Sequence, residues 1–236
     1  MSYLFVVPTI MARPALEIAN VENIAKQFPE SRILFVSNIE DKDFESYTPT
    51  MGNIHKYVSG KKYSIARALN LGLSRLTEDY FVFVQSDVTL NRELIELFKQ
   101  VALDFKNTGV IGIQPHTTFT RFNKQLDYAD AVLHRVLWTD GIMFIPRTVV
   151  EQVGFFNEEY LGDRESQEYC YRVHDKGWSN ILVSNPKKGN WKHNSVPFSN
   201  KVKDNAHELI TVKNKSTELF LREWSAWEDQ QKELFN

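Results

Sequence analysis

The chain has 236 residues, of which 42% are hydrophobic and 13% aromatic, enough to bury one substantial core in a single domain or a domain with a tail. Its formal net charge of -2 excludes a global field that would attract nucleic acid or an anionic membrane. The single cysteine, Cys170, excludes an internal disulfide and a zinc site built from several thiolates.

The first sixty residues predict a strand, a helix and a second strand. Apolar runs occupy residues 3–9 and 32–38, and a helical stripe with Pro14 in its first turn lies between them. The opening run lacks a basic leader and is too short to cross a bilayer, so we expect a soluble, cytoplasmic protein. Residues 39–62 are polar and are expected to be irregular.

Helices and strands keep alternating up to residue 114. Ser64 can cap a helix over residues 64–76, and residues 81–90, FVFVQSDVTL, predict a strand. A helix is expected from Asn91, followed by a strand at residues 110–114. This alternation predicts an α/β fold with a mostly parallel, Rossmann-like central sheet flanked by helices.

The second half is predicted to be less regular. Its expected elements are a long loop at 114–135, a strand at 140–147, a helix at 147–154, an acidic loop, a helix at 166–177, a strand at 181–185 and a helix over 205–235.

The tail carries Leu219, Phe220, Trp224, Trp227 and Phe235, which could cover the domain, pair two subunits or grip a ligand. Covering the core is the commonest use of such residues. We therefore divide the chain into a domain of residues 1–200 and a helical extension of residues 201–236, packed on the domain or at the interface of a homodimer.

Polar residues end the predicted strands, and in an α/β sheet the ligand crevice lies at the carboxyl ends of the strands. These residues are Pro8, Thr9, Ser37, Asn38, Gln85, Ser86 and Asp87. An aspartate there is a hard oxygen ligand for Mg²⁺ or Mn²⁺, although the local pattern suits a cap for the next helix equally well.

Three further groups are candidates for the same crevice. Arg67 and Asn70 share a helix face, and asparagine is a poor mid-helix residue. We therefore expect the two side chains to contact another group rather than form an ordinary solvent-exposed face. His193 lies in a polar segment and can close a metal site, or can simply be exposed. Acidic residues surround the helix predicted from Ser166; most fit pairing with the helix dipole, Arg164 or Arg172, and one could be a general base.

Several competing motifs are absent. The sequence has no G-x-G-x-x-G pattern for a dinucleotide and no G-x-S-x-G nucleophile elbow. The GKK at residue 60 lacks the earlier glycine of a phosphate loop, because that position is His55.

The order of segments resembles the inverting GT-A glycosyltransferases of family 2. The matching segments are VVPT, FVSN, ARALNLG, FVFVQSD, DGIMFIPR, GFFNEE, ESQEYCYR and KGW. With His193 as the family's late histidine, the match runs from about Leu4 to His193. FVFVQSD aligns with the strand that ends in the family's Asp-x-Asp motif, with Asp87 on the second aspartate and Gln85 in place of the first.

The resemblance implies a GT-A fold and a metal-assisted transfer of sugar from a nucleotide diphosphate, most plausibly a uridine one, to an acceptor hydroxyl. Asp87 and His193 would hold Mn²⁺ or Mg²⁺. Glu165 is the first candidate for the base, ahead of Asp163 and Glu168. The residues expected to bind the donor are Pro8, Thr9, Asn38, Arg67, Asn70, Gln85, Ser86 and Asp140.

Three departures from the family pattern leave alternatives open. Gln85 predicts weaker metal binding, Asn38 replaces an acidic nucleoside contact, and Ser166 stands at the family's second acidic position. The alternatives are a nucleotidyltransferase that makes a nucleotide sugar and a catalytically inactive module that binds nucleotide or glycan. The acceptor could be a glycan, a lipid-linked sugar or a modified DNA base, for which the lysines between Lys187 and Lys203 offer a basic stretch.

Overall fold

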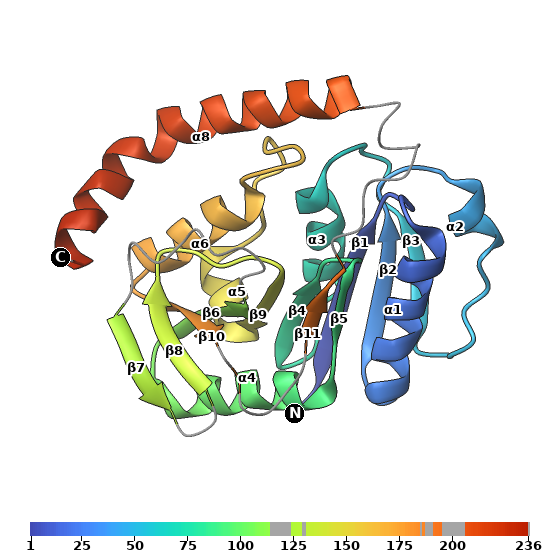
Figure 1. The fold of residues 1–236 in the computed structure, drawn as a ribbon, viewed down its shortest axis with the longest axis horizontal. Coiled ribbons are helices and arrows are strands. Elements are labelled where there is room, and N and C mark those ends of the chain that lie inside the picture. Colours follow the sequence, from blue (N-terminus) through green and yellow to red (C-terminus); the bar gives the residue numbers. More distant parts are fainter. Residues whose placement is uncertain (114–123, 129–130, 185, 187–190, 195–205, 236) are drawn as a thin grey trace.

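A computed structural model describes residues 1–113, 124–128, 131–184, 186, 191–194 and 206–235 (Figure 1). Its first half contains β1 (Tyr3–Thr9), α1 (Pro14–Gln27), β2 (Arg32–Ser37), α2 (Lys42–Ser46), β3 (Ile54–Val58), α3 (Ile65–Leu73), β4 (Tyr80–Val84), β5 (Val88–Leu90), α4 (Arg92–Asp104) and β6 (Thr108–Ile113). The remaining elements are β7 (Lys124–Tyr128), β8 (Ala131–Val136), β9 (Ile142–Pro146), α5 (Arg147–Val153), α6 (Glu165–Asp175), β10 (Ser179–Ser184), β11 (Trp191–His193) and α8 (Ala206–Phe235).

A nine-stranded sheet forms the centre, in the order β3-β2-β1-β4-β9-β6-β10-β8-β7. β1, β2, β3 and β4 pair in parallel, as do β6 and β10, whereas β9 is antiparallel to both β4 and β6. β8 is antiparallel to β10 and to β7. The α/β class and the mostly parallel sheet are thus confirmed.

Both faces of the central strands are buried, which explains their continuous apolar runs. Along β1, Phe5 and Val7 pack into one core cluster, and Leu4 and Val6 into another. The first cluster includes residues of α1, α2 and α4, and the second includes residues of α3, α5 and α6. The sheet therefore lies between two helical layers.

Local capping sets the starts of three helices at the positions that the sequence suggests. Pro14 occupies the first turn of α1, where its missing N–H costs no helical hydrogen bond. The Ser64 side chain accepts from the Arg67 backbone N–H, and Asn91 accepts from the Leu94 backbone N–H.

Four of the sequence predictions were wrong. The stretch expected to be irregular contains α2 and β3; α2 has only five residues, and β3 is an edge strand with one fully buried residue. The loop expected at 114–135 contains β7 and most of β8. In β8 the buried Ala131 and Leu133 alternate with the less buried Val132 and His134, because only one face packs on the core. The strand expected at 81–90 is two strands, because the chain turns at Gln85, whose carbonyl accepts from the Val88 N–H at 2.9 Å. The polar segment with His193 is β11, paired with β5.

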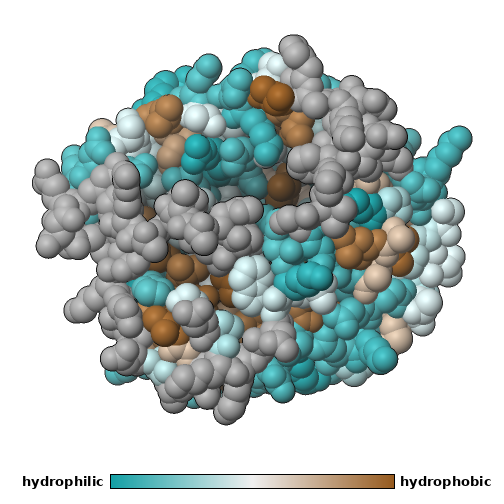
Figure 2. Space-filling view, viewed as in Figure 1, coloured by the Kyte–Doolittle hydropathy of each residue, from teal (hydrophilic) through white to brown (hydrophobic). Residues whose placement is uncertain are grey.

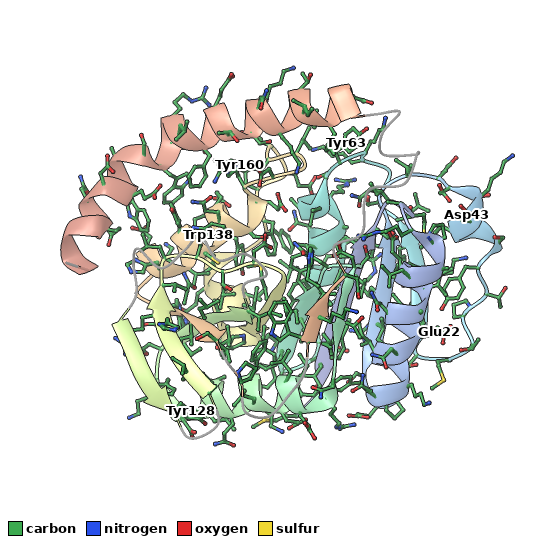
Figure 3. The ribbon with its side chains drawn as sticks, viewed as in Figure 1. Glu22, Asp43, Tyr63, Tyr128, Trp138 and Tyr160 are labelled. Carbon is green, nitrogen blue, oxygen red and sulfur yellow. The ribbon has the colours of Figure 1, made fainter. Side chains whose placement is uncertain are left out.

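The tail forms one long helix, α8, which lies across α6 and the segment before it (Figure 1). Leu219, Phe220, Trp224 and Trp227 pack in a cluster with residues of the domain, among them Tyr160 and Tyr171. The side chain of Phe235 lies outside the described residues. Tyr160, beneath the middle of α8, donates to Glu223 at 2.7 Å, and Tyr63, beneath its N-terminal end, donates to Glu208 at 3.3 Å (Figure 3).

The face of the molecule seen in Figure 2 is mixed where it is coloured. Figure 2 shows hydrophobic residues in separate groups interleaved with hydrophilic ones. Among the helices that the structure describes, none combines the length and apolar composition needed to cross a bilayer.

We expect Phe220→Ala to lower the free energy of unfolding by about 3 kcal/mol, because a fully buried phenylalanine would leave a cavity. Phe220 is 2% exposed, whereas its neighbour Leu221 is 54% exposed, so Leu221→Ala is the matched control and should change stability by less than about 0.5 kcal/mol. Urea unfolding followed by tryptophan fluorescence measures both. If the two variants lost equal amounts of unfolding free energy, the face of α8 that carries Phe220 would not contribute to the core.

Candidate functional site

Asp87 lies in the turn between β4 and β5, at the carboxyl end of a central strand. β11 pairs with β5 so that His193 lies opposite Val88, the residue after Asp87. This register brings the His193 Nε2 to 3.5 Å from the Asp87 Oδ2. The structure therefore joins two side chains that are about a hundred residues apart in the sequence, as expected.

Arg13 is a residue of this cluster that the sequence analysis did not select. Its Nη2 donates to the Asp87 Oδ2 at 2.6 Å, and its Nη1 donates to the Asn194 backbone oxygen at 2.6 Å. The Asn194 N–H in turn donates to the Asp87 backbone oxygen at 3.0 Å. A signal was present, because Arg13 follows β1 and precedes the Pro14 that starts α1, at the edge of the sheet where the crevice was expected.

The Asp87 and His193 side chains fit two positions in the coordination shell of a divalent ion. Carboxylate oxygen and imidazole nitrogen are donors that Mn²⁺ accepts, and both side chains are about one-fifth exposed. Within the described ranges, no group of three or more His, Cys, Asp or Glu residues could hold a metal. A bound ion would therefore need further ligands from substrate or water.

The ends of β1 and β2 are held next to each other. The Asn38 N–H donates to the Thr9 carbonyl at 2.9 Å, and the Thr9 hydroxyl donates to Glu17 and accepts from the Met11 N–H at 2.8 Å. Glu17 is 2% exposed, and burial raises the pKa of its carboxyl group despite the Thr9 hydrogen bond. Glu17, which the sequence analysis also did not select, therefore fixes the loop that follows Pro8.

The residues around Gln85 connect β4 to β9. The Gln85 Nε2 lies 3.4 Å from the Asp140 Oδ1, and its backbone N–H donates to the Gly141 oxygen at 3.1 Å. The Ser86 carbonyl accepts from the Asn20 side chain at 2.8 Å. Gln85 and Asp140, which were expected to share the donor, are thus neighbours.

Glu165 opens α6 and is 6% exposed. Burial, with smaller contributions from the charges of Asp140 and Asp163, raises the pKa of its carboxyl group to about 8. Its Oε2 has no hydrogen-bond partner among the residues that the structure describes. The carboxyl group is therefore protonated for much of the time at neutral pH, and one of its oxygens is a buried acceptor without a hydrogen bond from any described residue.

The two other candidate bases are engaged in local structure. Glu168 forms a two-point ion pair with Arg172, at 2.6 and 3.0 Å, and Arg172 also donates to the carbonyls of Val153 and Phe155. The Asp163 Oδ1 accepts from the Arg164 N–H at 2.9 Å. This geometry ranks Glu165 first.

Arg67 and Asn70 both contact the segment before α6, and the Arg67 side chain is still 53% exposed. Both bind the carboxylate of Glu158, Arg67 at 3.2 Å and Asn70 at 3.0 Å. Asn70 also exchanges two hydrogen bonds with the Phe156 backbone. In this arrangement Asn70 holds the loop, which explains an asparagine in mid-helix.

The sequence model of the family described as "Glycosyl transferase family 2" matches residues 5–159. No curated protein sequence matches the chain. Solved structures do resemble it. S. aureus TarS 1–349 in complex with UDP-GlcNAc has a TM-score of 0.57 at 16% identity, over 80% of this chain and 58% of that one.

Two other structures show the same fold. The mannosyltransferase PcManGT from Pyrobaculum calidifontis, in complex with GDP-Man and Mn²⁺, has a TM-score of 0.56 at 14% identity, over 77% of this chain and 55% of that one. The catalytic domain of Drosophila beta1,4galactosyltransferase 7, in complex with xylobiose, has a TM-score of 0.52 at 15% identity, over 83% and 71%. The chain spans between about a third and three fifths of the TarS structures it matches, and the GT-A fold is confirmed.

Proposed function

Because the chain belongs to glycosyl transferase family 2, we propose that it transfers a sugar from a nucleotide-diphosphate sugar, most plausibly a UDP-sugar, to an acceptor hydroxyl with inversion. The observation that carries the proposal is the Asp87–His193 pair at the carboxyl end of β4, with Glu165 linked to the same edge through Asp140 and Gln85. TarS binds UDP-GlcNAc and PcManGT binds GDP-Man, so nucleotide sugars are ligands of structures with this fold.

The donor is proposed to lie along the ends of β1, β2 and β4. Pro8, Thr9 and Asn38 would line the nucleoside side, where the Thr9 and Asn38 backbones are hydrogen-bonded to each other. Gln85, Ser86 and Asp140 would face the sugar and diphosphate. We assign Arg67 and Asn70 to the same side, where Asn70 acts by positioning the loop that carries Glu158.

Asp87 and His193 would be the protein ligands of a divalent ion, Mn²⁺ or Mg²⁺. Such an ion supplies positive charge against the negative charge that develops on the departing diphosphate. Gln85 contributes no charge to this group, so we expect metal binding weaker than at a pair of aspartates.

Glu165 would remove the proton from the acceptor hydroxyl. A base is most effective when its pKa lies near the working pH, and burial places the pKa of Glu165 at about 8. Its Oε2, buried and without a hydrogen bond from the described residues, is the atom that would take the proton. Asp163 and Glu168 follow as second choices, because each is already engaged in local contacts.

Residues 1–200 would form the transferase domain, and residues 201–236 an extension whose helix α8 contacts the segment that carries Glu165. The Leu161 N–H of that segment donates to the Ser216 hydroxyl of α8 at 2.7 Å, and a Cβ atom at Gly162 would lie 3.2 Å from the Leu209 side chain of the same helix. A glycan, a lipid-linked sugar and a modified DNA base remain the acceptor classes to test; of the basic stretch considered for DNA, only Lys192 falls within the described residues.

A thermal-shift screen of nucleotide sugars with and without Mn²⁺, followed by product analysis, tests the function. We expect one donor to stabilise the chain in the presence of metal and slow release of nucleoside diphosphate. Release of pyrophosphate instead would indicate nucleotidyl transfer. Binding with no turnover toward any of the three acceptor classes would indicate an inactive binding module.

A further inference from the structure

The Arg13 guanidinium pairs with the same Asp87 carboxylate oxygen that we assign as a metal ligand. Its Nη2 lies 2.6 Å from the Asp87 Oδ2, and the His193 Nε2 lies 3.5 Å from the same oxygen. The side chains of Arg13 and Asp87 are only 16% and 20% exposed, so this is a partly buried ion pair rather than a surface contact.

Arg13 is also held firmly in place. Its backbone N–H donates to the Glu17 Oε1 at 3.0 Å at the start of α1, and its Nη1 donates to the Asn194 oxygen at 2.6 Å. It therefore links α1, the turn after β4 and the chain that follows β11. The guanidinium itself is held by two of these contacts, with Asp87 and with the Asn194 oxygen.

The pair changes what the site can bind. With Gln85 in place of an aspartate, Asp87 is the carboxylate assigned to the metal, and the positive charge of Arg13 offsets its negative charge and so lowers its attraction for a divalent ion. An ion on the same oxygen would lie within a few ångströms of the guanidinium, and two positive charges that close repel each other. An anion between them removes the repulsion, and a guanidinium fork matches phosphate oxygens well.

We propose that Arg13 couples the two ligands of this site. It weakens divalent metal binding at Asp87 while nucleotide is absent, and it turns to the diphosphate when metal and nucleotide bind together. The inference rests on the proposed function, because it assumes a nucleoside diphosphate as the ligand. Since linkage is reciprocal, the diphosphate raises the affinity for metal by the same factor as metal raises the affinity for the diphosphate.

The test measures binding by the full chain, without turnover. Electron paramagnetic resonance of free Mn²⁺ gives metal affinity, and calorimetry with uridine diphosphate gives nucleotide affinity with and without Mn²⁺. In the parent chain we expect weak Mn²⁺ binding alone and at least tenfold tighter binding with uridine diphosphate. In Arg13→Gln we expect Mn²⁺ alone to bind at least threefold tighter, uridine diphosphate to bind at least tenfold weaker, and the coupling to shrink toward one.

Two further variants separate charge from folding. Arg13→Lys keeps the charge and should retain weak Mn²⁺ binding in the absence of nucleotide. Arg92→Gln removes another ion pair of 2.6 Å, with Glu30, whose side chains are both 47% exposed at the surface, and should leave both affinities unchanged. Far-UV circular dichroism and urea unfolding confirm that each variant is folded.

Opposite shifts of metal and nucleotide affinity would support the proposal, because loss of structure would weaken both. Unchanged or weaker Mn²⁺ binding by folded Arg13→Gln, with nucleotide still bound, would overturn the role of Arg13 and leave the proposed function standing. Absence of uridine diphosphate binding by the parent chain, with or without metal, would count against the proposed function and would remove the basis for the coupling as well.

Discussion

Asp87→Asn is expected to lower kcat for transfer about 10²- to 10³-fold, the cost of removing one strong electrostatic contact from a reaction centre. The substitution keeps the size of the side chain but removes the charge that pairs with Arg13 and lies 3.5 Å from His193. Release of nucleoside diphosphate from the donor identified in the screen measures the rate, and Mn²⁺ titration measures the loss of metal binding.

Asp79→Asn is the matched control, because Asp79 is half exposed and bonds the Ser2 N–H at the protein surface. Its activity should equal that of the parent chain. Undiminished, metal-dependent turnover by Asp87→Asn would remove Asp87 from the mechanism and leave the turn after β4 with a purely structural role.

Glu165→Gln should lower kcat by about 10²- to 10⁴-fold, the range expected when a general base is lost. Because the pKa of Glu165 is about 8, the parent rate should rise with pH through that value as the carboxyl group loses its proton. The residual rate of the glutamine variant should not follow this rise. A pH series of initial rates, at saturating donor, measures both.

The pH dependence of the free energy of unfolding should also reflect the titration of Glu165. The pKa of Glu165 is raised from 4.5 to about 8 in the folded chain, so the folded state retains a proton that the unfolded state loses. Stability therefore falls as pH rises from about 4.5 to about 8, because the folded state binds more protons in that interval. Glu165→Gln should flatten this decline in urea unfolding measured at several pH values.

Glu168→Gln distinguishes Glu165 from the nearest alternative. Both carboxylates are buried on α6, but Glu168 is paired with Arg172, so Glu168→Gln should destabilise the chain at any pH where Glu168 is ionised, by removing the charged partner of that guanidinium. A rate profile that loses its rise near pH 8 in Glu168→Gln, and retains it in Glu165→Gln, would reverse the assignment.

The central strands could be predicted from the sequence because both of their faces are buried. β1, β2 and β4 read as unbroken apolar runs, and Pro14, Ser64 and Asn91 mark the helix starts. The peripheral strands could not, because β3 and β8 bury one face and resemble loops in composition. Burial on two faces leaves a stronger trace in sequence than burial on one.

From the residues alone, site residues could be predicted only where they lie at the end of a buried strand. Asp87, Gln85 and Thr9 follow buried strands, and the resemblance to family 2 pointed to Glu165 and His193. Arg13 does follow a buried strand, but its pairing with Asp87, like that of Glu158 with Asn70, joins segments far apart in the chain. Glu17 lies within α1 and is placed by a local contact with Thr9. The effect of the Asp140 charge on the pKa of Glu165 could not be predicted from the sequence either, because it depends on the tertiary structure that brings the two residues near each other.

The pairing of β5 with β11 has a consequence for comparing related chains. His193 is positioned by its register opposite Val88, not by the number of residues that precede it. Insertions between β10 and β11 should therefore be tolerated in evolution without moving the imidazole, whereas deletion of one residue inside β11 would turn it to the opposite face. Equivalent histidines in relatives should be matched by their cross-strand neighbour, even where sequence spacing disagrees.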